Sequence, residues 1–596
     1  MFLRCHPRQK DGKLHRYWSI VESRRVRGGG VVQRRVLYLG EVNDSQREGW
    51  RKTIEVLEEG RPEPRSLALF PEDRPPAVPD DTVVQVRLRE LTVRRPRQWG
   101  ACWLACQLWG DLELDRFWGE RLEPSRKGTR WDLTLTALTA YRLLDPGSEW
   151  RLHRLWFDQS AMADLLGEDF GIAEKDTLYR CLDKLLPHKP ALFSHLQARW
   201  ATLFGARYEV LLYDLTSPYV ESSPPFAEAD KRQFGHSRDK RSDCVQVVVA
   251  LVITPDGFPL AYEVLAGNTA DKTTLRGFLQ RIEQQYGQAS RIWLMDRGIP
   301  TEAVLAEMRA SQPPVAYLVG TPKGRLTRLE HALTALPWQQ ARAGVEVKLL
   351  PQAGEVYVLA QSDDRRHKER AIRRRQLKTL WKRLHQLREM SLARDALLLK
   401  LGAAKQQAPA AWRLVEIQLP ADTEPLRFAL HKDRLRAVRR REERYLLRTN
   451  LTAAEPAQLW GFYMQLVRVE EAFRTLKGDL GLRPIYHQHG SRIEAHIFLA
   501  FLAYCLHVTL AQRLTPHAAG LTPRAVLDQL KAIQMLDVRV PTTDGRWLHM
   551  ARYTQPTKTQ QVLLAQLGLH LPAQPLPRLG PREVFHHSPC GEDFKK

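Results

Sequence analysis

Three carboxylates stand where the sequence pattern favours metal-dependent chemistry. Asp214 ends the apolar run YEVLLYD, Asp296 ends RIWLMD, and Glu470 lies in the helical stretch YMQLVRVEEAFRTLK at 463–477. An acid that follows an apolar run is held at the carboxyl end of a strand, and two such ends can lie side by side in one sheet. Carboxylate oxygens of this kind are ligands that suit Mg²⁺ or Mn²⁺. The three residues therefore predict a site for divalent cations.

The helix around Glu470 has an apolar stripe and a separate polar row. At about 100° per residue, six apolar residues fall within a narrow arc. They are Phe462, Leu466, Val469, Phe473, Leu476 and Leu480. We expect Glu471 to point away from this arc into solvent, whereas Glu470 lies on its edge, in one row with Tyr463 and Lys477. If the stripe packs on the sheet, the row delivers Glu470 to the two aspartates.

Each of these residues also has an ordinary structural interpretation. An Asp after an apolar strand is often a turn or helix-capping residue. Glu470 can form an ion pair with Arg474 one helical turn later, in the favourable order with Glu first. Tyr463 and Lys477, taken alone, are typical helix-surface residues. The order of all the residues along the chain, and not any single one, favours chemistry.

The composition is that of a large, soluble and basic protein. The chain has 596 residues, of which 43% are hydrophobic and 27% charged, with a net charge of +23 and a pI near 9.8. This length exceeds what one hydrophobic core usually holds, so we expect several domains. The positive excess favours a polyanionic partner, with nucleic acid as the first candidate.

The sequence argues against a membrane or secreted protein. The strongest apolar run, IFLAFLAYCLHVTLA from Ile497, contains His507 and is shorter than the ~20 residues of a membrane span, so we expect a buried helix. The first residues, MFLRCHPRQKDGK, do not resemble a signal peptide. Seven scattered cysteines without CxxC spacing indicate reduced thiols in the cytoplasm rather than a structural zinc site.

The order of predicted elements divides the chain into six segments. Strand-like runs, helical runs and proline-rich punctuation mark the changes between them. The segments are a β-rich part at 1–75, a helical DNA-binding part at 76–205, the first part of a mixed α/β core at 206–322, an insertion at 323–455, the second part of the core with the Glu470 helix at 456–515, and a C-terminal region at 516–596.

The predicted core at 206–322 consists of three β-rich runs followed by alternating helices and strands. The runs YEVLLYDLTS, CVQVVVALVITPDG and FPLAYEVLAG come first, and RIWLMDRG and VAYLVGTPKG follow after helical stretches. This order predicts one mixed sheet with helices packed on it. In the amino-terminal part, RYWSIVESRRV and VVQRRVLYLG predict two strands, and FPEDRPPAVPDD predicts a linker.

The order Asp214, Asp296, Glu470 on strand, strand and helix, with a long insertion before the helix, resembles the DDE insertion-sequence transposases, which have an RNase H-like core. Five further segments are also similar to sequences of that family. They are GHSRDKRSDCVQVVVALVITPDGFPLAYEVLAGNTADKTTL, DRGI, YLVGTPKG, LLRTNL and VEEAFRTLKGDLGLRPIYHQHGSRIEAHIFLAFLAY. The resemblance covers about 206–515. It implies an RNase H-like mixed sheet flanked by helices, with a β-plus-helical insertion before the Glu helix and a helical amino-terminal region.

More narrowly, the chain is similar to the group whose Glu helix carries a Tyr-x2-Arg-x3-Glu-x6-Lys signature. Tyr463, Glu470 and Lys477 match this signature, and Leu466 stands in the place of its Arg. Two neighbouring arginines could offset that departure. They are Arg468 and Arg474.

The resemblance implies metal-dependent phosphoryl transfer on DNA. Asp214 would bridge two Mg²⁺ or Mn²⁺ ions, with Asp296 and Glu470 each completing the coordination of one ion. Water would cut at the ends of the element, and the freed 3′-hydroxyl would attack target DNA. The partners would be double-stranded DNA, as terminal inverted repeats and as target, and a second copy of the chain in a homodimer or larger assembly. The protein would work at the nucleoid in the cytoplasm, without a membrane.

Contacts with the DNA backbone are expected in three places. Tyr463 and Lys477, with Arg474 and Arg468 beside them, would touch phosphates near the scissile bond. The loop GHSRDKRSD, with Arg238 and Lys240 among its basic residues, is either a second backbone contact or a solvated loop. The run RRHKERAIRRRQLKTLWKRLHQLR is either a DNA clamp or a solvated helix, and the net charge favours DNA.

Two other functions fit parts of the same pattern. One is a DNA-binding relative without catalysis, for which Leu466 is the sequence feature. The other is an RNase H-like nuclease that cuts structured DNA without joining it. His487 and His489 form a His-x-His pair that could bind zinc, but we expect no third ligand nearby, and Asp271 is expected to start a helix. GTPKG lacks the spacing of an ATP-binding P-loop.

Overall fold

The computed structural model describes residues 2–580, apart from 11–12, 26–30, 41–83, 225, 227–229, 287–290, 297–298, 322–328, 330–331, 334, 391, 419–425, 441–444 and 518–519. The linker predicted at FPEDRPPAVPDD lies outside these residues. The six cysteines that the structure describes are all free, as the sequence predicts.

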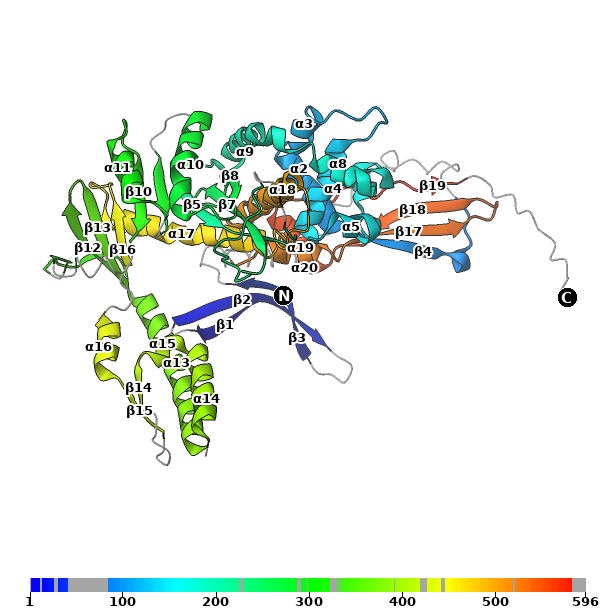
Figure 1. Ribbon diagram of the computed structural model, residues 1–596. Coiled ribbons are helices and arrows are strands. Elements are labelled where there is room, and N and C mark those ends of the chain that lie inside the picture. The colour runs from blue at the N-terminus through cyan, green and yellow to red at the C-terminus, as the bar shows by residue number, and fades with distance from the viewer. Residues whose placement is uncertain are drawn as a thin grey trace, which may run out of the picture.

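A ten-stranded mixed sheet forms the centre of the molecule (Figure 1). Its first strands are β5 (Val210–Thr216), β7 (Val245–Ile253), β8 (Pro259–Ala266), β9 (Ile292–Met295) and β10 (Ala316–Gly320), with the short β6 (Tyr219–Val220) at one edge. β5, β9 and β10 are parallel neighbours, while β7 and β8 are antiparallel to their partners. All nine residues of β7 are buried, because both faces of this strand are covered. The mixed α/β sheet predicted from the apolar runs is confirmed.

Helices cover both faces of this sheet. They are α10 (Asp271–Tyr286), α11 (Glu302–Ala310), α17 (Pro456–Lys477) and α18 (Gly490–Leu514). In Figure 1, α10 and α11 lie above the central strands and α17 runs across below them. The expected helix start at Asp271 agrees with the first residue of α10.

The insertion begins by extending the central sheet. Its strands β11 (Gln339–Arg342), β12 (Val345–Gln352) and β13 (Glu355–Ser362) join the sheet through β16 (Tyr445–Thr449), which pairs with β10. The pairing of β10 with β16 was not predicted, because these strands are far apart in sequence and the sequence shows only local patterns. The predicted insertion therefore contains strands that belong to the same sheet as the core.

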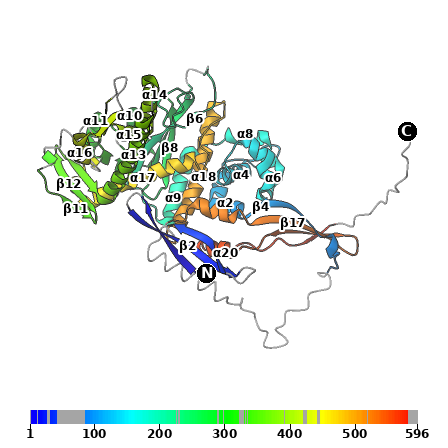
Figure 2. The same cartoon turned by 90° about the horizontal axis from the view of Figure 1, so that it is seen from below.

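The rest of the insertion forms a separate helical lobe with its own core. Its elements are α13 (Asp363–Glu389), α14 (Arg394–Gln407), α15 (Pro409–Trp412), β14 (Val415–Gln418), β15 (Arg427–Leu430) and α16 (Lys432–Arg440). Leu380, Leu384 and Leu387 of α13 pack with Leu397 and Leu401 of α14. The basic run predicted as a helix is confirmed as α13. Figures 1 and 2 both show this lobe at the end of the molecule opposite to β17.

The amino-terminal sheet has three strands, β1 (Phe2–Lys10), β2 (Lys13–Arg25) and β3 (Val31–Gly40). The prediction of two strands missed β1. This strand lies at the edge and pairs only with β2, so Pro7 is tolerated and few apolar residues are needed. β2 also contacts α13 of the helical lobe.

The helical region after residue 99 shares a sheet with the C-terminal region. Its main helices are α2 (Gly100–Asp111), α3 (Leu114–Gly119), α4 (Trp131–Leu144), α8 (Lys175–Leu182) and α9 (Lys189–Phe204). Ahead of them, β4 (Thr92–Gln98) pairs with β17 (Gln534–Pro541), which continues to β18 (Trp547–Tyr553) and β19 (Arg578–Leu579). The buried Arg97 side chain fixes this pairing, with ion pairs of 2.8 Å to Asp164 and to Asp537.

α18 is the central helix of the molecule rather than a membrane span. It is long and apolar enough to cross a membrane, yet 89% of its apolar window is buried inside the protein. Its residues pack against α4, α2, α8 and α17, with α19 (Pro523–Leu530) at one end. The prediction of a buried helix at IFLAFLAYCLHVTLA is confirmed.

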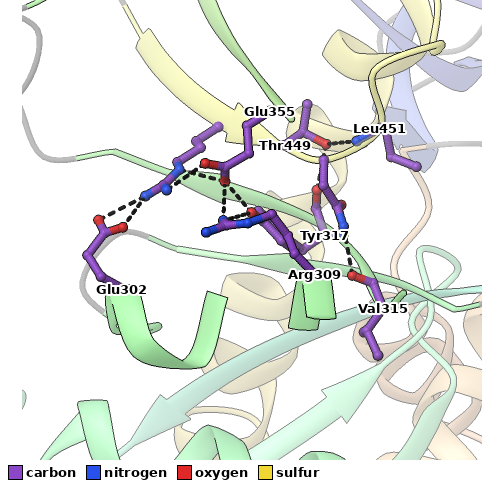
Figure 3. Close-up of polar contacts among 9 residues, drawn as sticks. Glu302, Arg309, Val315, Tyr317, Glu355, Thr449 and Leu451 are labelled. Atoms are coloured by element: carbon purple, nitrogen blue, oxygen red, sulfur yellow. Dashed lines mark hydrogen bonds and ion pairs between the residues drawn. The ribbon is translucent and has the colours of Figure 1, made fainter. Parts of the chain in front are cut away.

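A buried ion network ties the outer strands to the core (Figure 3). Glu355 of β13 accepts hydrogen bonds from Arg448 of β16, with Nε at 2.7 Å and Nη2 at 2.6 Å, and from the Tyr317 hydroxyl of β10. Arg309 of α11 lies 2.8 Å from the same carboxylate, and Arg448 also reaches Glu302. Three strands and one helix therefore meet at one carboxylate.

Candidate active site

The structure brings Asp214 and Asp296 together on neighbouring parallel strands. β5 pairs with β9 up to Tyr213 opposite Met295, so the two aspartates are the next residues on each strand. Paired strands lie ~4.8 Å apart. Asp296 is exposed directly after β9, and Asp214 is half-buried, with its Oδ1 accepting a hydrogen bond from the Leu215 N–H at 2.7 Å.

Asp214 does not end its own strand, and this part of the prediction is wrong. β5 continues for two more residues because β7 pairs with it on the other side, with Asp214 opposite Leu251 and Thr216 opposite Val249. The prediction holds for the β5–β9 ladder, which ends one residue before Asp214. The apolar run shows where the local hydrophobic pattern stops but not how far the backbone pairing extends.

The Glu470 helix packs against the strands that carry the aspartates. Tyr213 donates a hydrogen bond to Thr274 Oγ1 of α10 at 2.8 Å, so its side chain faces α10. Because successive side chains of a strand point to opposite faces, Asp214 faces away from α10. α17 contacts β5, β7, β9 and β10, and Figure 1 shows it on the side of the sheet away from α10.

Within α17, the apolar stripe is buried and Glu470 is exposed. Phe462, Val469, Phe473 and Leu476 have at most 8% of their surface exposed. Glu470 forms no hydrogen bond or ion pair with any residue that the structure describes, and its alternative pairing with Arg474 is absent there.

Glu471 is held by a neighbour instead of pointing freely into solvent. It forms an ion pair of 3.1 Å with Arg468, and 45% of its side chain is exposed. The expectation that Glu471 points directly into solvent is therefore only partly right. The two adjacent glutamates therefore differ: Glu471 is paired with Arg468 on the helix surface, and Glu470 is exposed.

The two other residues of the Glu470 row lie on opposite sides of it. The Tyr463 ring is half-buried and lies 5.5 Å from the Trp460 ring. The ammonium of Lys477 is 2.9 Å from Asp239 Oδ1, and 13% of the Lys477 side chain is exposed. Burial lowers the pKa of Lys477, and the hydrogen bond to Asp239 offsets part of that change.

A cavity of about 470 Å³ opens beyond the end of β5. Its lining comes from β5 and its continuation, the loop before β7, β7 itself and the segment after β8. The lining residues are Thr216, Ser217, His236, Arg238, Gln246, Val248, Gly267, Asn268, Thr269 and Ala270. Thr216 lies two residues after Asp214 on the same strand, so the cavity lies near Asp214. The predicted contact residue Arg238 is exposed at its wall, and Lys240 is exposed nearby.

A second group of polar residues lies apart from the aspartates. Ligand atoms of Glu149, His487 and His496 are within 4.8 Å of one another, and all three residues are buried. The sequence prediction found no third ligand beside His487 and His489, which was wrong for His487. The missed residues come from α5 (Glu149–Arg151) and α18, and no local spacing links Glu149 to His487.

The positive charge of the buried Arg142 side chain lies beside the Glu149 carboxylate of this group. Its Nη2 lies 3.7 Å from Glu149 and 3.3 Å from His496 Nδ1. Burial acts against the charge of Glu149, but His487 and Arg142 outweigh it, and the pKa of Glu149 falls to about 2. Burial lowers the pKa of His496 well below its ordinary value, so this ring is neutral. The group is a buried polar link between α4, α5 and α18.

Comparison with known proteins identifies the family to which the chain belongs. Residues 205–506 match the family model described as the transposase DDE domain, and residues 3–67 match the N-terminal domain of IS1634 family transposases. No curated protein matches the chain. A solved structure of a piggyBac transposase synaptic complex with hairpin DNA is 9% identical, with 74% of this chain and 82% of that chain covered and a TM-score of 0.35. The matched domain covers half of the chain, together with the strands and the helix that carry the three carboxylates, and the chain belongs to the DDE transposases, enzymes that act on DNA.

Proposed function

We propose that the protein is the transposase of an insertion sequence, which cleaves the ends of its element and joins the 3′ ends to target DNA. The observation that carries this proposal is the position of Asp214 and Asp296 one residue beyond a parallel ladder, with the Glu470 helix packed on the same strands. Without that register the three acids would be unrelated surface residues.

The donor set fits divalent cations, which DDE transposases use. Asp214, Asp296 and Glu470 offer only carboxylate oxygens, and Asp296 and Glu470 are exposed. When bound, two Mg²⁺ or Mn²⁺ ions would activate the attacking oxygen and stabilise the leaving oxygen. Asp214 would be shared between them, and the sheet would hold its carboxylate rigid through the Leu215 N–H.

The reaction has two steps of the same kind. In the first step, a water oxygen forms a bond to the scissile phosphorus as the bond to the 3′ oxygen breaks, and the 3′ oxygen leaves as a hydroxyl. In the second step, that hydroxyl forms a bond to a phosphorus of target DNA as a target 3′ oxygen leaves. The number of phosphodiester bonds is conserved in the second step, so no high-energy cofactor is required.

Basic side chains around the three carboxylates would hold the DNA backbone. Lys477 and Tyr463 lie in the Glu470 row, with Arg468 and Arg474 on the exposed side of the same helix. The loop before β7 adds two further basic residues beside the cavity, Arg238 and Lys240. Contacts of this kind position the duplex and carry no sequence information themselves.

The helical lobe provides a further basic surface. Arg374, Lys378 and Lys382 of α13, spaced by four residues, are all exposed and form one row, here called the α13 basic row. The alternative of a solvated helix applies to this row as well. We favour DNA because the chain carries a net charge of +23 and needs a polyanionic partner to balance it.

Two element ends must be held together for joining, so we propose a homodimer or larger assembly on DNA, at the nucleoid in the cytoplasm. The other candidates, a nuclease that does not join and a DNA-binding relative without catalysis, share the fold and differ in the reaction. A nuclease would give cut ends only, and the inactive relative would give neither product.

The test is a cleavage and joining assay. Purified protein, Mg²⁺ and labelled DNA from the flanks of its own coding sequence are incubated with a supercoiled target. We expect cut ends and joined products from the wild type, and loss of both with retained DNA binding in Asp214→Asn and Asp296→Asn. Asp256→Asn is the matched control, because Asp256 is an exposed aspartate in the turn between β7 and β8. Cutting by the two active-site variants at the wild-type rate would contradict the proposal.

A further inference from the structure

Lys477 of the Glu470 row donates a hydrogen bond to a buried carboxylate, that of Asp239, which lies in a loop with many basic residues. Asp239 lies in the loop GHSRDKRSD between β6 and β7, and only 6% of its side chain is exposed. Its Oδ1 accepts a hydrogen bond from Lys477 Nζ at 2.9 Å, and its Oδ2 lies 3.2 Å from Arg483 Nε. One acid thus meets two cations from the end of α17 and the segment that follows.

The backbone on both sides of this contact is fixed. Beyond α17, Ile485 runs beside β6, where its N–H donates to Tyr219 O at 3.3 Å and its carbonyl accepts from the Glu221 N–H at 2.8 Å. On the loop side, the Arg238 N–H donates to Ser217 Oγ at 3.2 Å. The Asp239 carboxylate is therefore held at a set place relative to β5, because Ser217 is the residue directly after the last residue of this strand, which carries Asp214.

The charge around Asp239 is not balanced. Lys477 and Arg483 both form ion pairs with Asp239, and one carboxylate cannot neutralise two cations. The ion pair with Arg483 lacks hydrogen-bond geometry, so the hydrogen bond that Asp239 accepts comes from Lys477. An ammonium has three N–H donors, of which this contact uses one. The cluster therefore retains positive charge, and Lys477 retains two N–H donors, which a phosphate group can accept.

We propose that Asp239 is a positioning residue for DNA cleavage: it holds the Lys477 ammonium at the end of the Glu470 row, so that the remaining donors of Lys477 meet a backbone phosphate beside the scissile bond. This inference rests on the proposed function. A lysine has four rotatable bonds and no preferred direction, so without a fixed partner its ammonium would sample many positions.

The carboxylate has a second effect, on the charge of Lys477. Burial lowers the pKa of Lys477, Arg483 and Arg238 lower it further, and Asp239 raises it. These are the charged groups that face the ammonium. Removal of the Asp239 charge leaves only the lowering influences, so Lys477 would lose its proton at a lower pH than in the wild type. A residue that merely supported the fold would not produce this change.

The experiment measures the rate of cleavage and the affinity for end DNA as functions of pH for Asp239→Asn. We expect a rate roughly 10- to 100-fold lower near neutral pH. We also expect the alkaline limb of both profiles to move to lower pH. Asp243→Asn is the control, because Asp243 is an exposed aspartate of the same loop that pairs with Arg241. It should leave both profiles unchanged.

Lys477→Arg in the Asp239→Asn background separates charge from fold. A guanidinium stays protonated throughout the range, so the alkaline limb should return to the wild-type position. An Asp239→Asn enzyme with the wild-type rate and profile would overturn the inference, and so would an equal shift in the double variant that carries Lys477→Arg. If the wild type binds the DNA but does not cut it, the proposed function fails, and the shift of the binding profile still decides the role of Asp239.

Discussion

Replacement of Glu355 by Gln tests how the outer strands are attached to the catalytic sheet. The Glu355 carboxylate is 4% exposed and accepts hydrogen bonds from Arg448 and Tyr317, with Arg309 at 2.8 Å. Glu355→Gln keeps the volume of the side chain, so no cavity forms. It removes the negative charge and leaves the Arg448 guanidinium, of which 7% is exposed, beside an amide.

The expected cost follows from these contacts. Removal of one partner of a buried ion pair destabilises a protein by ~3–5 kcal/mol, because the other charge stays buried without compensation. Arg448 keeps Glu302 as a partner at 2.8 Å, although 61% of that side chain is exposed and the pairing is screened by water. We therefore expect a loss near the lower limit, about 3 kcal/mol in the local stability of β10, β13 and β16.

Amide hydrogen exchange measures this local stability directly. A loss of about 3 kcal/mol corresponds to roughly two orders of magnitude faster exchange in β13 and β16. Glu346→Gln is the control, because Glu346 lies on the adjacent strand β12, is exposed, and accepts one hydrogen bond from Gln361 at 2.8 Å. Surface changes of this type stay within about 0.5 kcal/mol. Equal exchange in the two variants would refute the reasoning about the buried network.

Three other predictions concern pH, packing and DNA. Burial lowers the pKa of His507 from 6.5 to about 4, so between these pH values the unfolded chain binds a proton at this residue and the folded protein does not. The urea concentration at the midpoint of unfolding should therefore decrease as the pH is lowered from 6.5 to 4, and it should decrease less in His507→Gln. Gly267→Ala should lower the melting temperature, because a Cβ there would lie 2.0 Å from a β7 carbonyl oxygen, whereas Gly402→Ala in α14 meets open space and should not lower it. Replacement of the three residues of the α13 basic row by Gln should make the slope of log DNA affinity against log salt concentration less steep, by about 0.9 for each phosphate that the row no longer neutralises. An unchanged slope would indicate a solvated helix.

The elements predicted correctly are those whose signal is local. The apolar runs of β5, β7, β8, β9 and β10 are continuous because both faces of these strands are buried, and a buried strand can be seen in a few residues of sequence. α17 and α13 show their helical character equally within a short window. The boundaries of the six predicted segments remain predictions.

The missed features are pairings between distant residues. β4 and β17 pair across more than 400 residues through Arg97 and Asp537, and neither strand carries a signal for the other. The strands β11, β12 and β13 belong to the core sheet because β16, which follows the helical lobe in sequence, pairs with both β13 and β10. Sequence periodicity describes which face of an element is apolar, and it contains no information on the element that covers that face.

The candidate site shows the same division. Asp214, Asp296 and Glu470 were predicted as a set, since each belongs to an element with its own local signal, and their catalytic role remains a prediction. Asp239 could not be predicted, because basic residues outnumber acidic ones in the loop GHSRDKRSD, and only the fold shows that the Asp239 side chain is buried. Glu149 and His496 were missed for the related reason that three segments meet there.

The most direct test of the central claim compares adjacent glutamates of α17. Glu470→Gln and Glu471→Gln change the same chemical group at neighbouring positions, one exposed beside the sheet and one paired with Arg468. In a cleavage assay with Mg²⁺ and end DNA, we expect the wild type and Glu471→Gln to cut and Glu470→Gln to bind without cutting. Cleavage by Glu470→Gln at the wild-type rate, or loss of cleavage only in Glu471→Gln, would contradict the assignment of the third carboxylate.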